Sequence, residues 1–167
     1  KYNYVQSYTT RKSRENNEAG HIFVDELVYK KHKELNSDKS NELKIIAETF
    51  FGGNYYWTVN TQFLRDKINV YIVDPKGVDD LRKIKEFDVL TIYLKTDEEI
   101  RARRLIYREE AKSKFGCSKS YEIADERIMQ DKEIFKVIKT DYVVDSTRDS
   151  EKTLRDVIDI LQVEENK

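Results

Sequence analysis

Short apolar runs alternate along the chain with longer segments in which apolar residues recur at helical spacing. The apolar runs predict strands at residues 2–6, 21–24, 43–49, 70–73, 89–94 and 142–144. The periodic segments predict helices at 26–35, 78–84, 97–111 and 121–135, and a last helix with Leu154, Val157, Ile158 and Leu161 on one face. This alternation is typical of an α/β domain with a largely parallel sheet.

The run at residues 70–73 (VYIV) has no polar interruption and is followed by Asp74, Pro75 and Gly77. A parallel strand that is buried on both faces has this pattern. Asp74 can cap the helix that follows, or its carboxylate can hold a hydrated Mg²⁺ or a polar ligand. The pattern leaves both interpretations open.

The amino-acid composition indicates an ordered and highly charged protein. Its 167 residues are enough for one domain with a buried core, 38% of them are charged, and there are only five Gly and one Pro. The net charge of −1 argues against a nucleic acid polymer or a membrane surface as partner. Cys117 is the only cysteine, which excludes an internal disulfide and favours a cytoplasmic location.

The segment 7–14 (SYTTRKSR) combines Ser and Thr hydroxyls with three cations directly after the first predicted strand. Hydroxyls and exposed backbone N–H groups are short donors, and a planar guanidinium group can grip two oxygens at once. The segment therefore predicts a loop that binds a phosphate group. A solvated basic turn is the alternative.

Cations also recur on the two long predicted helices. Arg101, Arg104 and Arg108 form one stripe on the first, and Arg127 lies one turn before Asp131 on the second. The stripe can be a solvated, ion-paired surface. It can also belong to a lid that closes over a polyphosphate, because charge on a transferred phosphoryl group must be neutralised as it moves.

Aromatic residues lie on both sides of a predicted tight turn at Gly52 and Gly53 in the segment 50–57 (FFGGNYYW). We expect these aromatic side chains to lie in the core, although they can also line a base or phosphate pocket beside Thr58. Thr58 is expected to cap a short helix through residue 64. His32 shares a helix face with Val28 and Leu35, so it is predicted to be a packing residue.

Three of these segments resemble the guanylate kinase family. Residues 7–14 resemble its Ser-x-Thr-Thr-Arg-x-x-Arg loop, with Gly20 and residues 21–23 where Gly and Tyr-x-Phe usually follow. Residues 53–58 (GNYYWT) resemble its Gly-Asn-Tyr-Tyr-Gly-Ser/Thr turn, and residues 74–77 (DPKG) resemble the end of its Asp-x-Asp-x-x-Gly strand. The order holds along nearly the whole chain.

The resemblance implies a P-loop NTPase-like parallel sheet flanked by helices in a single domain, residues 1–167. It also implies a small mixed α+β monophosphate-binding subdomain at about 7–68 and a helical lid at about 98–135. The implied activity is transfer of the ATP γ-phosphate, with Mg²⁺, to GMP, dGMP or a related nucleoside monophosphate. A non-catalytic module of the same fold that binds a phosphorylated partner is the alternative.

The resemblance also implies roles for individual residues. The substrate-binding residues would be Ser7, Arg11, Arg14, His21, Tyr56, Thr58 and Asp74, of which Ser7, Arg11, Arg14 and Tyr56 hold the acceptor's phosphate and Thr58 touches its base. The catalytic lid cations would be Arg104, Arg108 and Arg127. Asp145 would lie near the adenine of ATP, and no protein metal ligand is predicted.

Several positions depart from the family pattern. A tyrosine is usual where His21 stands, and guanine-reading acids are usual near Ile45 and at Ile72. An apolar side chain leaves the donors of a guanine edge unpaired, so we expect a different or broader acceptor base. Glu42 or Glu48 would substitute if the alignment shifts by a few residues.

The sequence contains no Gly-x-x-x-x-Gly-Lys-Ser/Thr segment, which the family places before the 7–14 loop. A strand, phosphate loop and helix take about 25–30 residues. We therefore expect the sequence to be an N-terminally truncated part of a longer protein. Without that segment we expect weak ATP binding and little catalysis.

Overall fold

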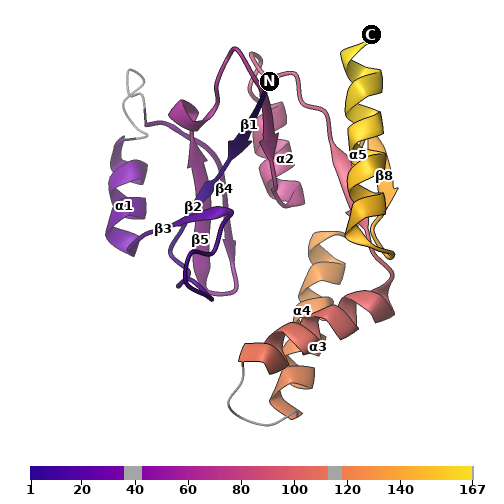
Figure 1. Cartoon of the computed structure of the whole chain (residues 1–167). Coiled ribbons are helices and arrows are strands. Elements are labelled where there is room, and N and C mark those ends of the chain that lie inside the picture. The colour runs from indigo at the N-terminus through magenta and orange to yellow at the C-terminus, as the bar shows by residue number, and fades with distance from the viewer. Residues whose placement is uncertain (36–42, 113–117, 167) are drawn as a thin grey trace. The chain divides into compact units, whose positions relative to one another are not determined.

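The structure, a computed structural model, describes residues 1–35, 43–112 and 118–166. The chain divides into two compact units, Lys1–Val89 and Leu90–Lys167. Figure 1 shows the helices and strands of each unit. None of the described helices is long and apolar enough to cross a membrane.

The first unit contains most of the strands. Its elements are β1 (Tyr2–Val5), β2 (Ser7–Thr9), β3 (His21–Phe23), α1 (Glu26–Leu35), β4 (Ile45–Phe51), β5 (Asn54–Val59), the 3₁₀ helix η1 (Asn60–Gln62), β6 (Ile68–Tyr71) and α2 (Pro75–Arg82). Strands β1 and β6 pair in parallel. The other four form a mixed sheet in the order β3-β2-β5-β4, in which β2 and β3 are parallel and β5 is antiparallel to both of its neighbours.

The β4–β5 hairpin turns at two glycines. Gly52 and Gly53 have φ values of 54° and 76°, the left-handed conformation that a tight hairpin turn needs and that side chains disfavour. The hairpin places Ala47 opposite Thr58 and Thr49 opposite Tyr56, and this register puts β5 between β4 and β2.

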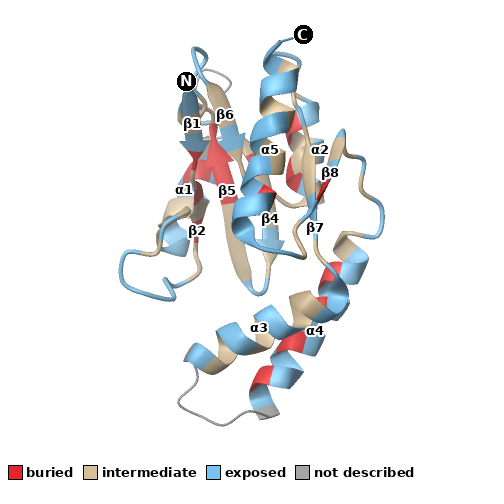
Figure 2. Ribbon diagram, turned by 45° about the vertical axis from the view of Figure 1, so that its right-hand side comes forward, coloured by how far each residue is buried: buried red, intermediate tan, exposed pale blue. Residues whose placement is uncertain are grey.

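Helix α1 covers the β4–β5 face and completes the core of this unit. Trp57 is fully buried beside Ile45 and Val59, with α1 packed over them (Figures 1 and 2). The Trp57 indole N–H donates to Nδ1 of His32 over 2.9 Å. His32 is therefore a packing residue as predicted, and the expectation that Trp57 lies in the core is confirmed.

The second unit consists of β7 (Ile92–Lys95), α3 (Glu98–Lys112), α4 (Ser118–Ile134), β8 (Tyr142–Asp145) and α5 (Ser150–Glu165). Strands β7 and β8 pair in parallel. Helices α3 and α4 pack together, and α5 packs against β8. In Figure 2 the buried residues of α4 form a narrow stripe along the helix.

The described strands form two parallel pairs, β1 with β6 and β7 with β8, and one four-stranded mixed sheet. The structure corrects two expectations. Residues 7–9 are a strand because β3 and β5 pair with them on either side, so the loop begins only at Thr10. Thr58 lies inside β5 and caps no helix. The 3₁₀ helix η1 begins at Asn60, and the residue at its N-cap position is Val59.

Candidate anion-binding site

Ser7, His21 and Tyr56 are brought together by the mixed sheet of the first unit. Ser7 is paired with His21 across β2 and β3, and Thr9 is paired with Tyr56 across β2 and β5. The Ser7 hydroxyl lies 2.8 Å from Nδ1 of His21. The rings of His21 and Tyr56 meet edge to face with their centroids 5.6 Å apart.

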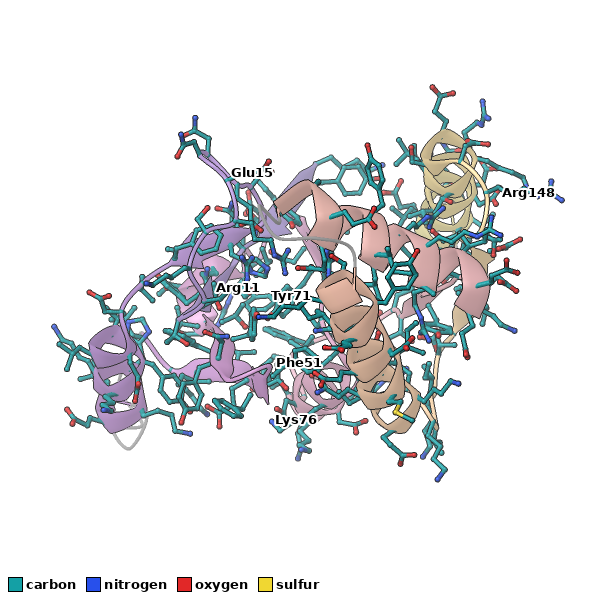
Figure 3. All side chains as sticks on the ribbon, turned by 90° about the horizontal axis from the view of Figure 1, so that it is seen from below. Arg11, Glu15, Phe51, Tyr71, Lys76 and Arg148 are labelled. Atoms are coloured by element: carbon teal, nitrogen blue, oxygen red, sulfur yellow. The ribbon has the colours of Figure 1, made fainter. Side chains whose placement is uncertain are left out.

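Arg11 stands at the edge of this group, directly after β2. Its backbone N–H donates to the Thr9 hydroxyl over 3.1 Å. Its guanidinium group lies 5.1 Å from the centroid of the Phe23 ring, within the range of a cation–π contact. Figure 3 labels Arg11 among the side chains of this unit.

Glu18 joins the two arginines of the loop. Its carboxylate accepts hydrogen bonds from Nη2 of Arg11 at 2.7 Å and from Nη1 at 3.1 Å. It also accepts one from the backbone N–H of Arg14 at 2.7 Å, and Nη1 of Arg14 lies 3.5 Å away. The side chains of Arg11 and Glu18 are each only 12% exposed, so the pair is largely shielded from solvent.

The charges of this cluster hold one another in their ionised forms. The hydrogen bond from Arg11 lowers the pKa of Glu18 from 4.5 to about 2, and the same bond raises the pKa of Arg11. Burial and the nearby Arg11 charge lower the pKa of His21 from 6.5. At neutral pH the site therefore combines two guanidinium groups, one carboxylate and an uncharged imidazole.

Two hydroxyls lie deeper in the same unit. Burial raises the pKa of Tyr71 to about 12, and interactions with Thr58 and Ser7 oppose the shift. Thr58 is fully buried, and its side chain lies within reach of the Tyr71 phenol. The structure thus places Thr58 beneath the surface of the sheet, although the resemblance has it touching a base.

Asp74 is the N-cap of α2. Its carboxylate accepts a hydrogen bond from the backbone N–H of Gly77 over 2.8 Å, and Pro75 occupies the first turn. Of the two interpretations of Asp74, helix capping is the one for which the structure shows a contact. The positions where guanine-reading acids are expected differ in burial, since Ile45 is in the core and Ile72 is 75% exposed.

In the second unit the three predicted lid arginines all have partners. Arg104 donates to the backbone carbonyls of Ser146, Thr147 and Arg148 over 2.9 to 3.2 Å. Nε of Arg108 lies 3.3 Å from a carboxylate oxygen of Glu109. Arg127 pairs with Asp131 one turn later at 3.1 Å, as its spacing suggested.

Asp145 ends β8. Its carboxylate accepts a hydrogen bond from the backbone N–H of Thr147 at 2.9 Å, and contacts with Thr147 lower its pKa. A cavity of about 150 Å³ beside β7, the start of α3 and the end of α4 is lined by Tyr93, Leu94, Thr96, Arg101, Asp131 and Phe135. Within the described ranges, no group of three or more His, Cys, Asp or Glu side chains could hold a metal ion.

Sequence reasoning found five of the residues that converge in the first unit, namely Ser7, Arg11, Arg14, His21 and Tyr56. It missed Glu18, the residue that ties the two arginines together. The signal was an acid close behind three cations, but only the left-handed turn at Asn17 (φ 63°) shows that the carboxylate faces back to Arg11. It also missed Tyr71, which looks like an ordinary strand residue in the run 70–73.

Comparison with solved structures finds a likeness in fold. A crystal structure of guanylate kinase from Anaplasma phagocytophilum matches with a TM-score of 0.62 and 20% sequence identity, over 99% of this chain and 77% of that chain. No protein-family model matches the chain, and no curated protein sequence matches it significantly. The likeness is in the fold, and the described residues show five α-helices with parallel strand pairs. The chain therefore has a guanylate-kinase-like fold.

Proposed function

We propose that the protein is a nucleoside monophosphate kinase of the guanylate kinase type. It would transfer the γ-phosphate of ATP to GMP or to a related ribo- or deoxynucleoside monophosphate. The observation that supports this most is the convergence of Ser7, Arg11, Arg14, His21 and Tyr56 on the mixed sheet. Such a group of donors and cations suits a phosphate that must be held still while it accepts a phosphoryl group.

The acceptor's phosphate would be bound by donors of different kinds. Arg11 and Arg14 supply charge-assisted hydrogen bonds, and Tyr56 supplies a phenol. Ser7 and His21 share one proton, so either the hydroxyl donates to Nδ1 or Nδ1 donates to the hydroxyl. In the first case Nε2 of His21 is left with an N–H, and in the second the Ser7 hydroxyl is left to donate.

The proposal also concerns which base the acceptor nucleotide carries. A guanine edge presents N–H donors, and Ile45 and Ile72 offer no acceptor for them. Glu48 is already engaged, since Nζ of Lys33 lies 2.8 Å from its carboxylate and the Tyr29 phenol donates to it over 3.2 Å. We therefore propose an acceptor range that is broader than GMP alone.

We propose ATP and Mg²⁺ as cofactors because the fold resembles that of guanylate kinase. Bound together, they would supply the phosphoryl group and neutralise its charge. Mg²⁺ in such sites is held largely by phosphate oxygens and water, which suits a protein whose described residues contain no cluster of metal ligands. We propose Asp145 on the adenine side, and Arg104, Arg108 and Arg127 as cations for the transferred group.

A coupled ADP-release assay tests the activity. The protein, together with any residues that precede Lys1, is assayed with ATP and Mg²⁺ against a panel of ribo- and deoxynucleoside monophosphates, and Arg11→Met is the matched variant. We expect turnover with at least one purine monophosphate and its loss in the variant. Monophosphate binding without turnover for every acceptor would replace the kinase with a module that binds a phosphorylated partner.

A further inference from the structure

Glu18 occupies an unexpected place for an acid, at the centre of a site proposed to bind an anion. Asn17 adopts a left-handed backbone conformation directly before it, with φ of 63°. This turn directs the carboxylate back toward Arg11, seven residues earlier, where it accepts two hydrogen bonds. A carboxylate in this position can either compete with a phosphate or orient the arginines for it.

The donors of Arg11 decide between these alternatives. A guanidinium group has five N–H bonds. Nη1 uses its two on Glu18 Oε2 and on the carbonyl of Lys12, at 3.1 and 2.9 Å, and Nη2 uses one on Glu18 Oε1 at 2.7 Å. The other two N–H bonds, one on Nε and one on Nη2, lie side by side along one edge of the planar group.

That remaining edge suits a second oxyanion. Nε of Arg11 is buried, and no acceptor among the described residues is in hydrogen-bonding geometry with it. Tyr56 helps to raise the pKa of Arg11, partly through a hydrogen bond between the two side chains, so its phenol lies against the guanidinium group and would turn its O–H toward a bound phosphate. A phosphate that accepts from Nε and Nη2 would form a bidentate pair without displacing Glu18.

We infer that Glu18 is a positioning residue that fixes Arg11 so that its Nε–Nη2 edge faces the acceptor's phosphate. This inference rests on the proposed function of the site. Glu18 takes the adjacent Nη1–Nη2 edge of the guanidinium group and holds the backbone of Arg14, and the two arginines still leave the cluster with a net positive charge. Because the Arg11 side chain is already ordered in the folded protein, phosphate binding does not bear the entropy cost of ordering it.

Whether Glu18→Gln raises or lowers the affinity for phosphate distinguishes a positioning role of Glu18 from competition with the phosphate. Glu18→Gln removes a negative charge beside the site, and simple electrostatics or competition would then tighten phosphate binding. Positioning predicts weaker binding, because an amide offers one acceptor and presents an N–H to the guanidinium group. Glu15→Gln is the matched control, since Glu15 is an exposed acid of the same loop and its substitution changes the charge equally.

The experiment titrates the full chain with inorganic phosphate, GMP and guanosine by calorimetry. We expect Glu18→Gln to weaken phosphate and GMP binding about tenfold or more, and Glu15→Gln to change it less than about twofold. The effect of Glu18→Gln should vanish in an Arg11→Lys background, because lysine has no second edge to orient. Nitrogen-15 spectra should show the Nε–H resonance of Arg11 shifting with phosphate in the wild type only.

Glu18→Asp keeps the charge and is used if the amide variant does not fold. Its side chain is one methylene shorter, so weaker phosphate binding is again expected. If the wild type binds phosphate and GMP but either Glu18 variant binds them equally or more tightly, the positioning role is wrong and the proposed function stands. If the wild type binds neither ligand, the proposed function itself fails.

Discussion

The ion pair between Glu18 and Arg11 makes a quantitative prediction about acid stability. The pKa of Glu18 is 4.5 without its partners and about 2 in the folded protein, where Arg11 stabilises the carboxylate. The folded-state pKa is the lower one, so protonation favours unfolding. The contribution of Glu18 is complete above about pH 5 and is lost as the pH falls toward about 2.

The magnitude follows from the shift. A depression from 4.5 to about 2 corresponds to about 3 kcal/mol if none of it is screened. The Arg11 and Glu18 side chains are largely shielded, but Glu18 also pairs with Arg14, whose side chain is 41% exposed, so solvent screening reduces the expected contribution to about 1–2 kcal/mol. Glu18→Gln should therefore unfold more easily than the wild type by about that amount at pH 7, and by almost nothing at pH 2.

Urea unfolding followed by tryptophan fluorescence measures this difference. Trp57 is the only tryptophan and is buried in the core of the first unit, so its emission reports the unit that contains the pair. Urea is preferred to guanidinium because it adds no ionic screening. A double-mutant cycle with Arg11→Met isolates the pair. A difference between wild type and Glu18→Gln that stays constant from pH 7 to pH 2 would refute the reasoning.

Four further predictions concern the fold. Replacing His32 with Leu leaves the Trp57 indole N–H buried without its acceptor, and should destabilise the first unit by about 1–3 kcal/mol in urea unfolding. Burial lowers the pKa of His32 from 6.5, so the wild type should lose stability as the pH falls from 7 to 5, and His32→Leu should lose less. Gly53→Ala should cost about 1–2 kcal/mol because φ is 76°, whereas Gly53→Asn should cost less. Arg104→Met should speed amide hydrogen exchange at residues 146–150, because Arg104 holds the carbonyls of Ser146, Thr147 and Arg148, and unchanged exchange would contradict that role.

Local patterns predicted the elements of this fold well. The strand at residues 21–24, the helices at 26–35 and 97–111 and the glycine hairpin all lie within a few residues of their predicted positions. These elements are specified by neighbours in the sequence, through apolar spacing, caps and glycine. His32 was also predicted correctly, because its helix face is apolar.

Long-range pairing was harder to predict. Residues 7–9 look like part of a polar loop, and they become a strand only because β3 and β5 supply hydrogen-bonding partners on both sides. The role of Glu18 has the same origin, since its contact with Arg11 depends on one left-handed residue between them. For the arginines, the sequence predicted a phosphate loop from residue types, and the structure adds which donors Arg11 has already used.

Calorimetric titration with nucleotide pairs tests the central claim, that the loop after β2 binds a monophosphate, most directly. The full chain is titrated with GMP and with guanosine, which differ only in the phosphate, and the wild type is compared with Arg11→Met. We predict saturable binding of GMP, no detectable binding of guanosine, and at least a tenfold loss of GMP affinity in the variant, as expected for about one charge-assisted bidentate pair. Equal binding of GMP and guanosine, or an Arg11→Met variant that binds GMP as tightly as the wild type, would contradict it.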